Sequence, residues 1–383
     1  MKIIAFYLPQ FHNIPENDEW WGNGFTEWTN VKAAKPIYDG HHQPRVPLNN
    51  NYYNLLDDNI KIWQAEIAKQ HGIYGFCYYH YWFNGRLILE KPMEQMLRNK
   101  NVDIPFCICW ANEPWTKSWL GKKTVLIPQT YGDEREWKNH FEYMLPFFRD
   151  PRYIREDNCP VIIIYRPTVM RCVAQMTSFW KKLAIDSGFD GIKLMCLADN
   201  LLPENRAIYS SFDNIIEWQP SAAKYIKKES KYPLINTLKS ARRRVLARLE
   251  QLTGIDFRQW DPANIIKNKE LQFLSYDQVW NDILNIVPSS SKNLPGAFVR
   301  WDNTPRFHEK GSVIKGATPE KFGEYIKNQI IHAKDTYKSD KLFLFAWNEW
   351  AEGGYLEPDE EYGYGYLNAL REALLQTNEF PTW

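Results

Sequence analysis

The sequence has no excess charge of either sign and no long apolar run. Its 47 Lys and Arg residues face 46 Asp and Glu residues, a formal net charge of +1, so nothing attracts the whole chain to nucleic acid or an anionic membrane. A membrane-spanning helix needs about 18 or more consecutive apolar residues, and no such run occurs. The apolar stretch at residues 1–9 is too short for a signal peptide. We therefore expect a cytoplasmic protein, unless a leader has been removed.

Cysteine and metal-binding motifs are also scarce. The six cysteines include no C-x-x-C spacing, and four of them lie in apolar runs. This pattern favours reduced thiols in the core over disulfides or a metal site. No H-x-x-H or H-E-x-x-H motif occurs, and the adjacent His41 and His42 lie in a long loop. We expect neither a metal nor another cofactor.

Aromatic residues, in contrast, are abundant. The chain contains 17 Trp, 22 Tyr and 20 Phe, together 15% of its residues, which is more than we expect a core to need. Flat rings that stack on ligands are one use for such an excess. Hydrophobic residues at 44% and charged residues at 24% are sufficient for a folded core and argue against disorder.

Short apolar runs alternate with helix-length amphipathic segments along the chain. Three helices are readable from their period, at residues 60–68, 169–186 and 322–333, the last after the start signal Thr318-Pro319-Glu320. Such alternation is typical of parallel β/α units. The apolar runs span residues 3–8, 73–79, 105–110, 161–165, 192–197, 214–218, 297–301 and 342–347. Eight units predict an α/β fold of the (β/α)8 TIM barrel type.

Two connections between these units are long. They cover about residues 9–59 and 219–294, and we expect both to lie over the C-terminal face of one catalytic domain that spans residues 1–383. Within the second, residues 224–248 hold nine basic side chains and one acidic side chain. A solvated basic helix packed on the barrel explains this segment. The alternative is peripheral contact with an anionic glycan or a lipid-linked substrate.

Reactive groups of TIM barrels lie at the C-terminal ends of the strands. Every predicted strand end carries hydrogen-bonding groups, and most add an aromatic ring. A pyranose has an apolar face that stacks on rings and hydroxyls that bind carboxylates and amides. We therefore expect an aromatic-lined sugar cleft. The ring residues expected to contact sugar are Trp28, Tyr79, His80, Trp82, Trp110, Trp218 and Trp301, and the residues expected to bind hydroxyls are Glu27, Asn112, Glu113, Asp302 and Asn348.

Cleavage of a glycosidic bond generally requires two carboxylates. The strand ends offer Glu113, Glu217, Glu349 and Glu352. Glu349 and Glu352 follow an apolar run on one turn, are accompanied by Trp350 and have no Lys or Arg nearby in the sequence. We expect both to face the cleft without a basic partner.

The stretch around this pair resembles a known catalytic motif. Residues 347–353 read W-N-E-W-A-E-G, followed by L-E-P at 356–358, similar to the N-E-W-x-E-G motif of the endo-α-mannosidases and endo-α-mannanases of glycoside hydrolase family ninety-nine. The whole chain more closely resembles the bacterial WbsX-type proteins, labelled glycosyltransferases and associated with surface-polysaccharide gene clusters. That resemblance extends to A-F-Y-L-P-Q-F-H at 5–12, W-G-N-G-F-T-E-W-T-N-V at 21–31, Y-Y-H-Y-W-F at 78–83 and W-A-N-E at 110–113.

The mannosidase resemblance implies a retaining barrel enzyme in which the sugar's own 2-hydroxyl attacks the anomeric carbon. Carried over, Glu349 takes the proton of that hydroxyl, and Glu352 protonates the leaving oxygen and then activates water. The chemistry requires a 2-hydroxyl trans to the leaving group, as in α-mannosides and α-rhamnosides. Glu352 must then be protonated near neutral pH, and we expect burial beneath Trp350 or a nearby carboxylate to raise its pKa.

Three alternatives stay open at this point. Glu113 with Glu349 is a rival catalytic pair, because N-E-P at 112–114 resembles the acid/base motif of another clan of retaining barrels. A glycosyltransferase or transglycosylase of O-antigen or capsule synthesis is the second, although the chain has neither D-x-D nor G-x-G-x-x-G. The third is a non-catalytic glycan-binding module. The partner in every case is an oligosaccharide or polysaccharide, and the sequence says nothing of the oligomeric state.

Overall fold

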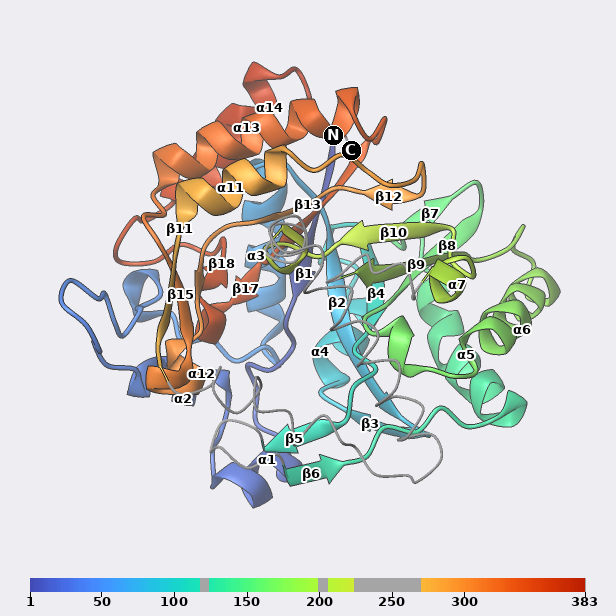
Figure 1. The fold of residues 1–383 in the computed structure, drawn as a ribbon. Helices are drawn as coiled ribbons and strands as arrows, with labels where there is room; N and C mark the ends of the chain where they lie inside the picture. Colours follow the sequence, from blue (N-terminus) through green and yellow to red (C-terminus); the bar gives the residue numbers. More distant parts are fainter. Residues whose placement is uncertain (118–123, 199–205, 224–269, 383) are drawn as a thin grey trace, which may run out of the picture.

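Parallel strands form a nearly closed barrel sheet at the centre of the molecule (Figure 1). The computed structural model describes residues 1–117, 124–198, 206–223 and 270–382. The first strand pairs in parallel with the second on one side and with the last on the other. The barrel strands are β1 (Lys2–Tyr7), β2 (Ile73–Phe83), β4 (Phe106–Trp110), β8 (Cys159–Ile164), β9 (Lys193–Ala198), β10 (Asn214–Glu217), β12 (Asn293–Leu294), β13 (Gly296–Phe298) and β16 (Lys341–Phe345). The predicted TIM barrel is confirmed.

The seventh barrel position is built from two short strands. β12 pairs with β10, and β13 pairs with β16. Pro295 alone lies between β12 and β13, and it interrupts the strand because proline has no N–H to donate to the ladder. A side chain at Gly296 would collide with the carbonyl of Glu217, so only glycine fits at this closure. The strand predicted at residues 297–301 therefore overlaps β13 only at residues 297 and 298, and Trp301 belongs to a separate small sheet.

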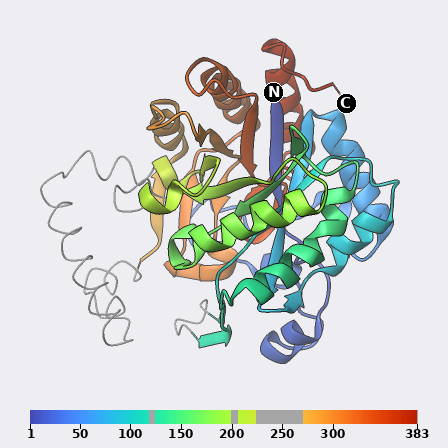
Figure 2. The same ribbon diagram turned by 90° about the vertical axis from the view of Figure 1, so that its right-hand side faces the viewer.

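Helices cover the outside of the barrel, and Figure 2 shows α5 and α6 side by side across one flank. The predicted start signal is real, because Thr318 Oγ1 accepts a hydrogen bond from the backbone N–H of Lys321 at the start of α13. The helix predicted at residues 169–186 starts later, at Val173, after a 3₁₀ turn. The outer helices are α3 (Asp58–Gln70), α4 (Lys91–Arg98), α5 (Glu134–Arg149), α6 (Val173–Asp186), α7 (Arg206–Tyr209), α11 (Tyr276–Leu284), α13 (Pro319–Asp335) and α14 (Gly365–Gln376).

Shorter elements follow the strand ends. The first long connection contains three helical segments, whereas most of the second, with the basic stretch at 224–248, lies outside the described residues. The helical segments are α1 (Pro15–Trp21), α2 (Glu27–Ala33), η1 (Leu48–Asn50), η2 (Pro167–Val169), α12 (Thr304–Phe307), η5 (His308–Lys310) and η6 (Trp350–Glu352). The minor strands are β3 (Arg86–Ile88), β5 (Trp115–Lys117), β6 (Thr124–Ile127), β7 (Arg155–Glu156), β11 (Gln272–Ser275), β14 (Trp301–Asp302), β15 (Ser312–Lys315), β17 (Asn348–Glu349) and β18 (Gly354–Tyr355).

Much of the aromatic excess is core. Among the largest fully buried side chains are Trp180, Trp280, Trp347 and Trp350. Only some of the aromatic residues are therefore in excess of what the core uses. All six cysteines are free thiols, four of them buried, as expected. Among the described residues, no helix is long and apolar enough to cross a membrane, and no group of three His, Cys, Asp or Glu side chains is placed to hold a metal ion.

Candidate active site

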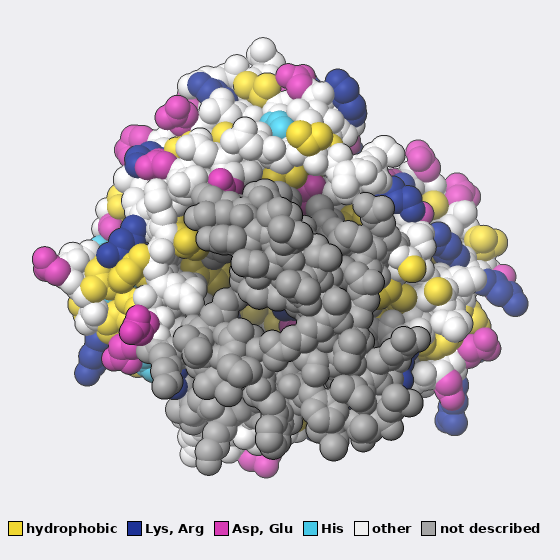
Figure 3. Space-filling view, viewed as in Figure 1, with side chains coloured by type: hydrophobic (Ala, Val, Ile, Leu, Met, Phe, Trp, Pro, Cys, Tyr) yellow, Lys and Arg dark blue, Asp and Glu magenta, His cyan; other side chains and the backbone are white. Residues whose placement is uncertain are grey.

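A cleft of about 420 Å³ lies at the C-terminal ends of the barrel strands. Every barrel position contributes to its wall, either directly or through the residues that follow the strand. In Figure 3, which is viewed as in Figure 1, a few acidic and basic side chains are visible near the centre of this face. Of the residues predicted to act or to bind sugar, the cleft wall contains Glu27, Tyr79, Glu113, Trp218, Trp301, Glu349 and Glu352.

Strand alternation decides which side chains of β2 reach the cleft. Successive residues of a strand point to opposite faces. Tyr79 and Tyr81 line the cleft, whereas His80 and Trp82 point outward to α5, where the Trp82 ring stacks on His140 at 4.6 Å. The predictions for His80 and Trp82 were therefore wrong, and Tyr81 was missed. The period of two within this strand was the signal that could have separated them.

We expect substitutions on the two faces of β2 to have different effects. Trp82→Phe replaces the packed indole with a smaller ring and removes the hydrogen bond from Trp82 Nε1 to Glu136 at 2.5 Å, so it lowers the free energy of unfolding by about 1–2 kcal/mol without changing oligosaccharide affinity. Tyr81→Ala weakens oligosaccharide binding about fivefold, because a stacking face is lost. Urea denaturation and calorimetric titration of both variants check this. Weaker binding by Trp82→Phe would contradict the assignment of faces.

Two amides that were predicted to bind hydroxyls instead join neighbouring strand ends. Asn348 accepts a hydrogen bond from the backbone N–H of Leu8 at 2.7 Å and donates to its carbonyl at 3.0 Å. Asn112 makes the same pair of bonds to Arg166, at 2.7 and 2.9 Å. Each amide imitates a neighbouring peptide group and is fully buried. Neither lines the cleft, so their predicted contact with hydroxyls is wrong, and both align the strand ends that carry cleft residues.

Three further predicted residues are buried in other contacts. Trp28 packs on Trp350 at 5.3 Å and donates to the carbonyl of Tyr53, so it supports the acidic turn from outside the cleft. Trp110 points outward to His140 and other helix residues. Glu217 accepts hydrogen bonds from Asn293 and Tyr337, and it too is absent from the cleft wall. These side chains were misassigned because a ring or carboxylate near a strand end can face either side of the barrel.

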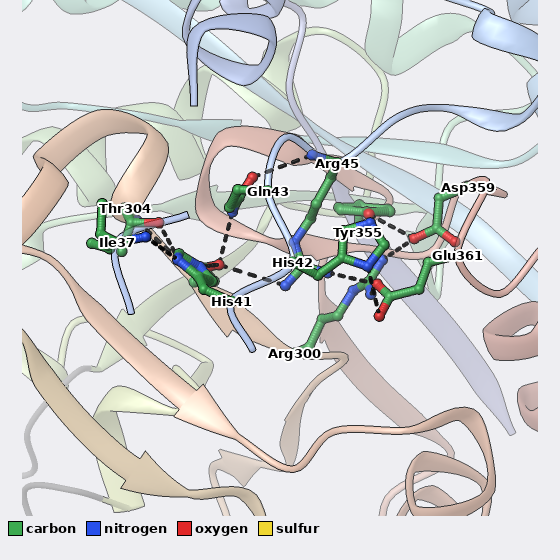
Figure 4. A network of polar contacts seen from close by, with 11 residues as sticks. Ile37, His41, His42, Gln43, Arg45, Arg300, Thr304, Tyr355, Asp359 and Glu361 are labelled. Atoms are coloured by element: carbon green, nitrogen blue, oxygen red, sulfur yellow. Dashed lines mark hydrogen bonds and ion pairs between the residues drawn. The ribbon is translucent and has the colours of Figure 1, made fainter. Parts of the chain in front are cut away.

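Asp302 anchors a loop instead of binding substrate. One of its oxygens lies 2.9 Å from His41 Nε2 and accepts from Gln43 Nε2 at 2.8 Å, and Figure 4 shows His41, Gln43 and Thr304 of this network. The other oxygen accepts from the backbone N–H and hydroxyl of Thr304 at the start of α12. Asp302 is 1% exposed. It therefore ties the first long loop to the short helix that carries Arg306.

Glu349 and Glu352 both face the cleft from one turn. Glu349 ends β17, which pairs with β18, and Glu352 ends the 3₁₀ turn η6. Gly353 follows with a φ of 63°, a left-handed conformation that glycine adopts readily. The side chain of Glu349 is 6% exposed and that of Glu352 is 19% exposed. The deeper burial that the sequence predicted for Glu352 thus falls on its neighbour, and the ring of Trp350 stacks on Tyr355.

Arg306 bridges the acidic pair, contrary to the expectation of no basic partner. Its guanidinium lies 2.5 Å from Glu352 Oε1, 3.3 Å from Glu349 Oε2 and 2.7 Å from Glu27 Oε1. It comes from α12, 46 positions before Glu352 in the chain, so local sequence carried no sign of it. One positive charge cannot neutralise three carboxylates. The cluster keeps an excess of negative charge unless it also holds protons.

Burial decides where protons are held in this cluster. Burial raises the pKa of Glu349 to about 8; Arg306 opposes this shift, and the charges of Glu352 and Glu27 add to it. Burial also raises the pKa of Glu27, although Arg306 stabilises its charge. Burial alone would lower the pKa of Arg306, but the carboxylates around it raise the value well above the ordinary one. Near neutral pH the site therefore keeps a proton on a carboxyl that faces the cleft.

Glu113 occupies another part of the same wall. Its side chain is 46% exposed and lies 3.2 Å from Arg166 Nε. Both Glu113 and Glu349 line the cleft, which is compatible with the rival catalytic pair. Glu113, however, is open to solvent. Its oxygens are placed to accept hydrogen bonds from hydroxyls of a bound sugar.

Comparison with known proteins places the fold and the family. The model of the family described as Glycosyltransferase WbsX matches residues 3–370. Two proteins of Xanthomonas campestris pv. campestris, both named uncharacterized protein WxcX, from strains B100 and ATCC 33913, are 32% and 33% identical over 99% of this chain. The chain spans about half the length of these relatives.

Solved structures with the same fold include a GH99 endo-alpha-mannosidase from Bacteroides thetaiotaomicron. It is 12% identical, with a TM-score of 0.54, and the alignment covers 98% of this chain and 97% of the mannosidase. A structure described as a glycoside hydrolase-like protein is also 12% identical, with a TM-score of 0.57, over 100% of this chain and 94% of the other. At this identity the likeness establishes the barrel fold alone.

Proposed function

The chain belongs to the WbsX glycosyltransferase family of carbohydrate-active proteins, and from the cleft we propose that it is a retaining glycoside hydrolase for α-manno-configured linkages of a bacterial polysaccharide. The observation that carries the proposal is the shared guanidinium: Arg306 contacts both Glu349 and Glu352, so the two carboxyls face one region of the cleft. In α-mannosides and α-rhamnosides the 2-hydroxyl lies trans to the leaving group, as attack of O2 on C1 requires.

The proposed reaction has two steps. Glu349 takes the proton of the 2-hydroxyl while O2 attacks C1, and Glu352 gives its proton to the leaving oxygen, so a 1,2-anhydro sugar and a shortened glycan form. Water then opens the anhydro ring at C1, giving its proton to Glu352, and O2 regains a proton from Glu349. The pair needs one proton in total at the start. The raised pKa of Glu349 supports a pair that retains one proton at neutral pH.

Rings and carboxylates of the wall supply substrate contacts in this proposal. Trp218 and Trp301 offer stacking faces, and Glu113 accepts hydroxyl hydrogen bonds. Glu27 is fully buried, and no donor among the described residues reaches its Oε2. Its contact with Arg306 at 2.7 Å makes it an ionic support for the pair.

The test is a screen of the purified protein against mannans, rhamnans and O-antigen oligosaccharides, with product configuration followed by proton NMR. We expect release of oligosaccharide with retained anomeric configuration. Inverted product would contradict the two-step route. If no member of the panel is cleaved while nucleotide sugars are consumed, the hydrolase proposal fails.

The proton held by the pair predicts a pH dependence. kcat/KM should fall as the pH rises through about 8, because the free enzyme then loses the proton that the pair needs. Glu27→Gln should move this fall to lower pH, since the charge of Glu27 helps raise the pKa of Glu349. A pH–rate profile of both proteins checks this. A rate that climbs steadily up to pH 10 would exclude the pair as proton donor.

A glycosyltransferase is the second candidate, favoured by the description of the family itself. The same cleft could pass the 1,2-anhydro sugar to a glycan hydroxyl in place of water, which would make the protein a transglycosylase. Adding an acceptor oligosaccharide to the hydrolysis assay distinguishes these outcomes, because transfer yields longer products and hydrolysis does not.

A further inference from the structure

A second cavity of about 400 Å³ lies on the other side of the acidic turn. Glu349 and Glu352 line the cleft, whereas Trp350 between them lines this second cavity. The rest of its wall comes from the first long loop, from α3, from the segment after β18 and from the residue that caps the start of α14. The lining residues that bear on a ligand are Asn49, Asn50, Trp63, Trp350, Glu357 and Tyr364.

The wall combines rings with amides in the way a pyranose requires. Trp63 is half-buried and Tyr364 is 37% exposed, so both present ring surface near the opening. Asn49 and Asn50 both adopt left-handed backbone conformations, with φ of 57° and 55°, and their side chains are exposed. Rings stack on the apolar face of a sugar, and amides bind its hydroxyls.

The charge of the wall favours a neutral ligand over an anionic one. No described lysine or arginine lines the cavity, and Glu357 is one of its lining residues. Glu360 adds a second acidic group nearby, because its Oε1 accepts the backbone N–H of Asn49 at 2.6 Å. A phosphate or uronate would meet like charge there without a described cation on the wall, whereas a neutral sugar would not.

Buried hydrogen bonds hold the wall of the second cavity in place. Glu357 is 3% exposed and accepts from Tyr53 Oη at 2.8 Å, Trp350 Nε1 at 2.7 Å and Gln64 Nε2 at 2.6 Å. Burial raises the pKa of Glu357 to about 7 despite these bonds. Because Trp350 is held by Glu357 and stands between the two cleft carboxyls in the chain, the cavity and the cleft share one rigid turn.

We propose that this second cavity binds a neutral pyranose unit of a glycan, at a site separate from the cleft. The site stands on its own lining residues and does not depend on the hydrolytic mechanism. It would hold a part of a long polysaccharide that lies away from the bond being cleaved, or a separate chain.

The experiment follows the tryptophan indole signals of the 383-residue chain by ¹⁵N NMR, with the signal of Trp63 assigned from Trp63→Phe. The probes are methyl α-D-mannopyranoside, methyl α-L-rhamnopyranoside and methyl β-D-glucopyranoside, with D-glucuronate as the anionic control. We expect at least one neutral probe to shift the Trp63 signal saturably, and glucuronate to bind at least about fivefold more weakly. No saturable shift with any neutral probe, or equal binding of glucuronate, would overturn the proposal.

Matched variants separate this cavity from the cleft. Tyr364→Ala should weaken the response at Trp63 about fivefold, because it removes a stacking face. Leu375→Ala, at a similarly exposed position of α14, should leave it unchanged. Trp218→Ala should also leave it unchanged, and its loss in that variant would mean that the signal is relayed from the cleft. Failure of the hydrolase proposal would appear as absent turnover with the Trp63 response intact.

Discussion

Glu352→Gln and Glu349→Gln should each lower kcat/KM about 10³-fold on whichever glycan the wild-type protein cleaves. Each change leaves the shape of the side chain and removes one proton-transfer group, and such groups contribute about 10² to 10⁴ in rate. Both side chains line the cleft and share the guanidinium of Arg306, so losing either one leaves the other without its proton partner. Single-turnover measurements at pH 7 separate the loss of chemistry from a loss of binding.

Glu372→Gln is the control for these two variants. Its side chain is 58% exposed on α14, away from the cleft wall, so we expect full activity. A Glu352→Gln protein that forms product as fast as the wild type would remove Glu352 as the acid. Undiminished binding by both variants, with no turnover of any tested glycan by the wild type, would instead favour the glycan-binding module.

Arg306→Met should lower the free energy of unfolding by about 3–5 kcal/mol at pH 8.5, because it leaves buried carboxylates without their cation. The loss should shrink near pH 5. When folding raises the pKa of a carboxyl, that group stabilises the folded state at any pH below its ordinary pKa of 4.5. The stabilisation is lost as the pH rises through the pKa in the folded state, which is about 8 for Glu349. Urea denaturation at the two pH values measures the difference.

Two further variants test this charge account. Glu27→Gln combined with Arg306→Met should recover part of the stability, because one of the unpaired charges is gone. Arg371→Met removes an exposed arginine that lies 3.6 Å from Glu372 and should change stability by less than about 1 kcal/mol. An Arg306→Met protein as stable at pH 8.5 as the wild type would show that the three carboxyls are already protonated together.

The arginine bridge bears directly on the proposed chemistry. A guanidinium that fully neutralised Glu349 and Glu352 would leave no proton donor, and the hydrolase proposal would fall. The charge count argues otherwise, because Glu27 takes a share of the same guanidinium, and the raised pKa of Glu349 favours one proton held within the pair, which the proposed first step uses on Glu352. Arg306 thus holds the three carboxyls together without fully neutralising Glu349 and Glu352.

The sequence by itself determined the barrel and the position of the acidic turn. Apolar runs of strand length are separated by amphipathic helices, and a parallel sheet covered by helices is the arrangement that buries those runs. Glu349 and Glu352 follow the last run and precede two glycines, which places them at the C-terminal face of the barrel. These features are local, because they depend on periodicity and turn chemistry within a few residues. The alternation that puts Tyr81 in the cleft and Trp82 outside is equally local.

Only the tertiary structure decided which groups meet. Arg306 lies 279 positions from Glu27 in the chain, and Asn348 lies 340 positions from Leu8, yet each pair is within hydrogen-bonding distance. Such contacts are set by how strand ends and loops converge when the sheet closes, and neither composition nor spacing encodes them. Burial is decided in the same way, which is why the deeper carboxyl is Glu349 and why Asp302 anchors a loop away from the cleft.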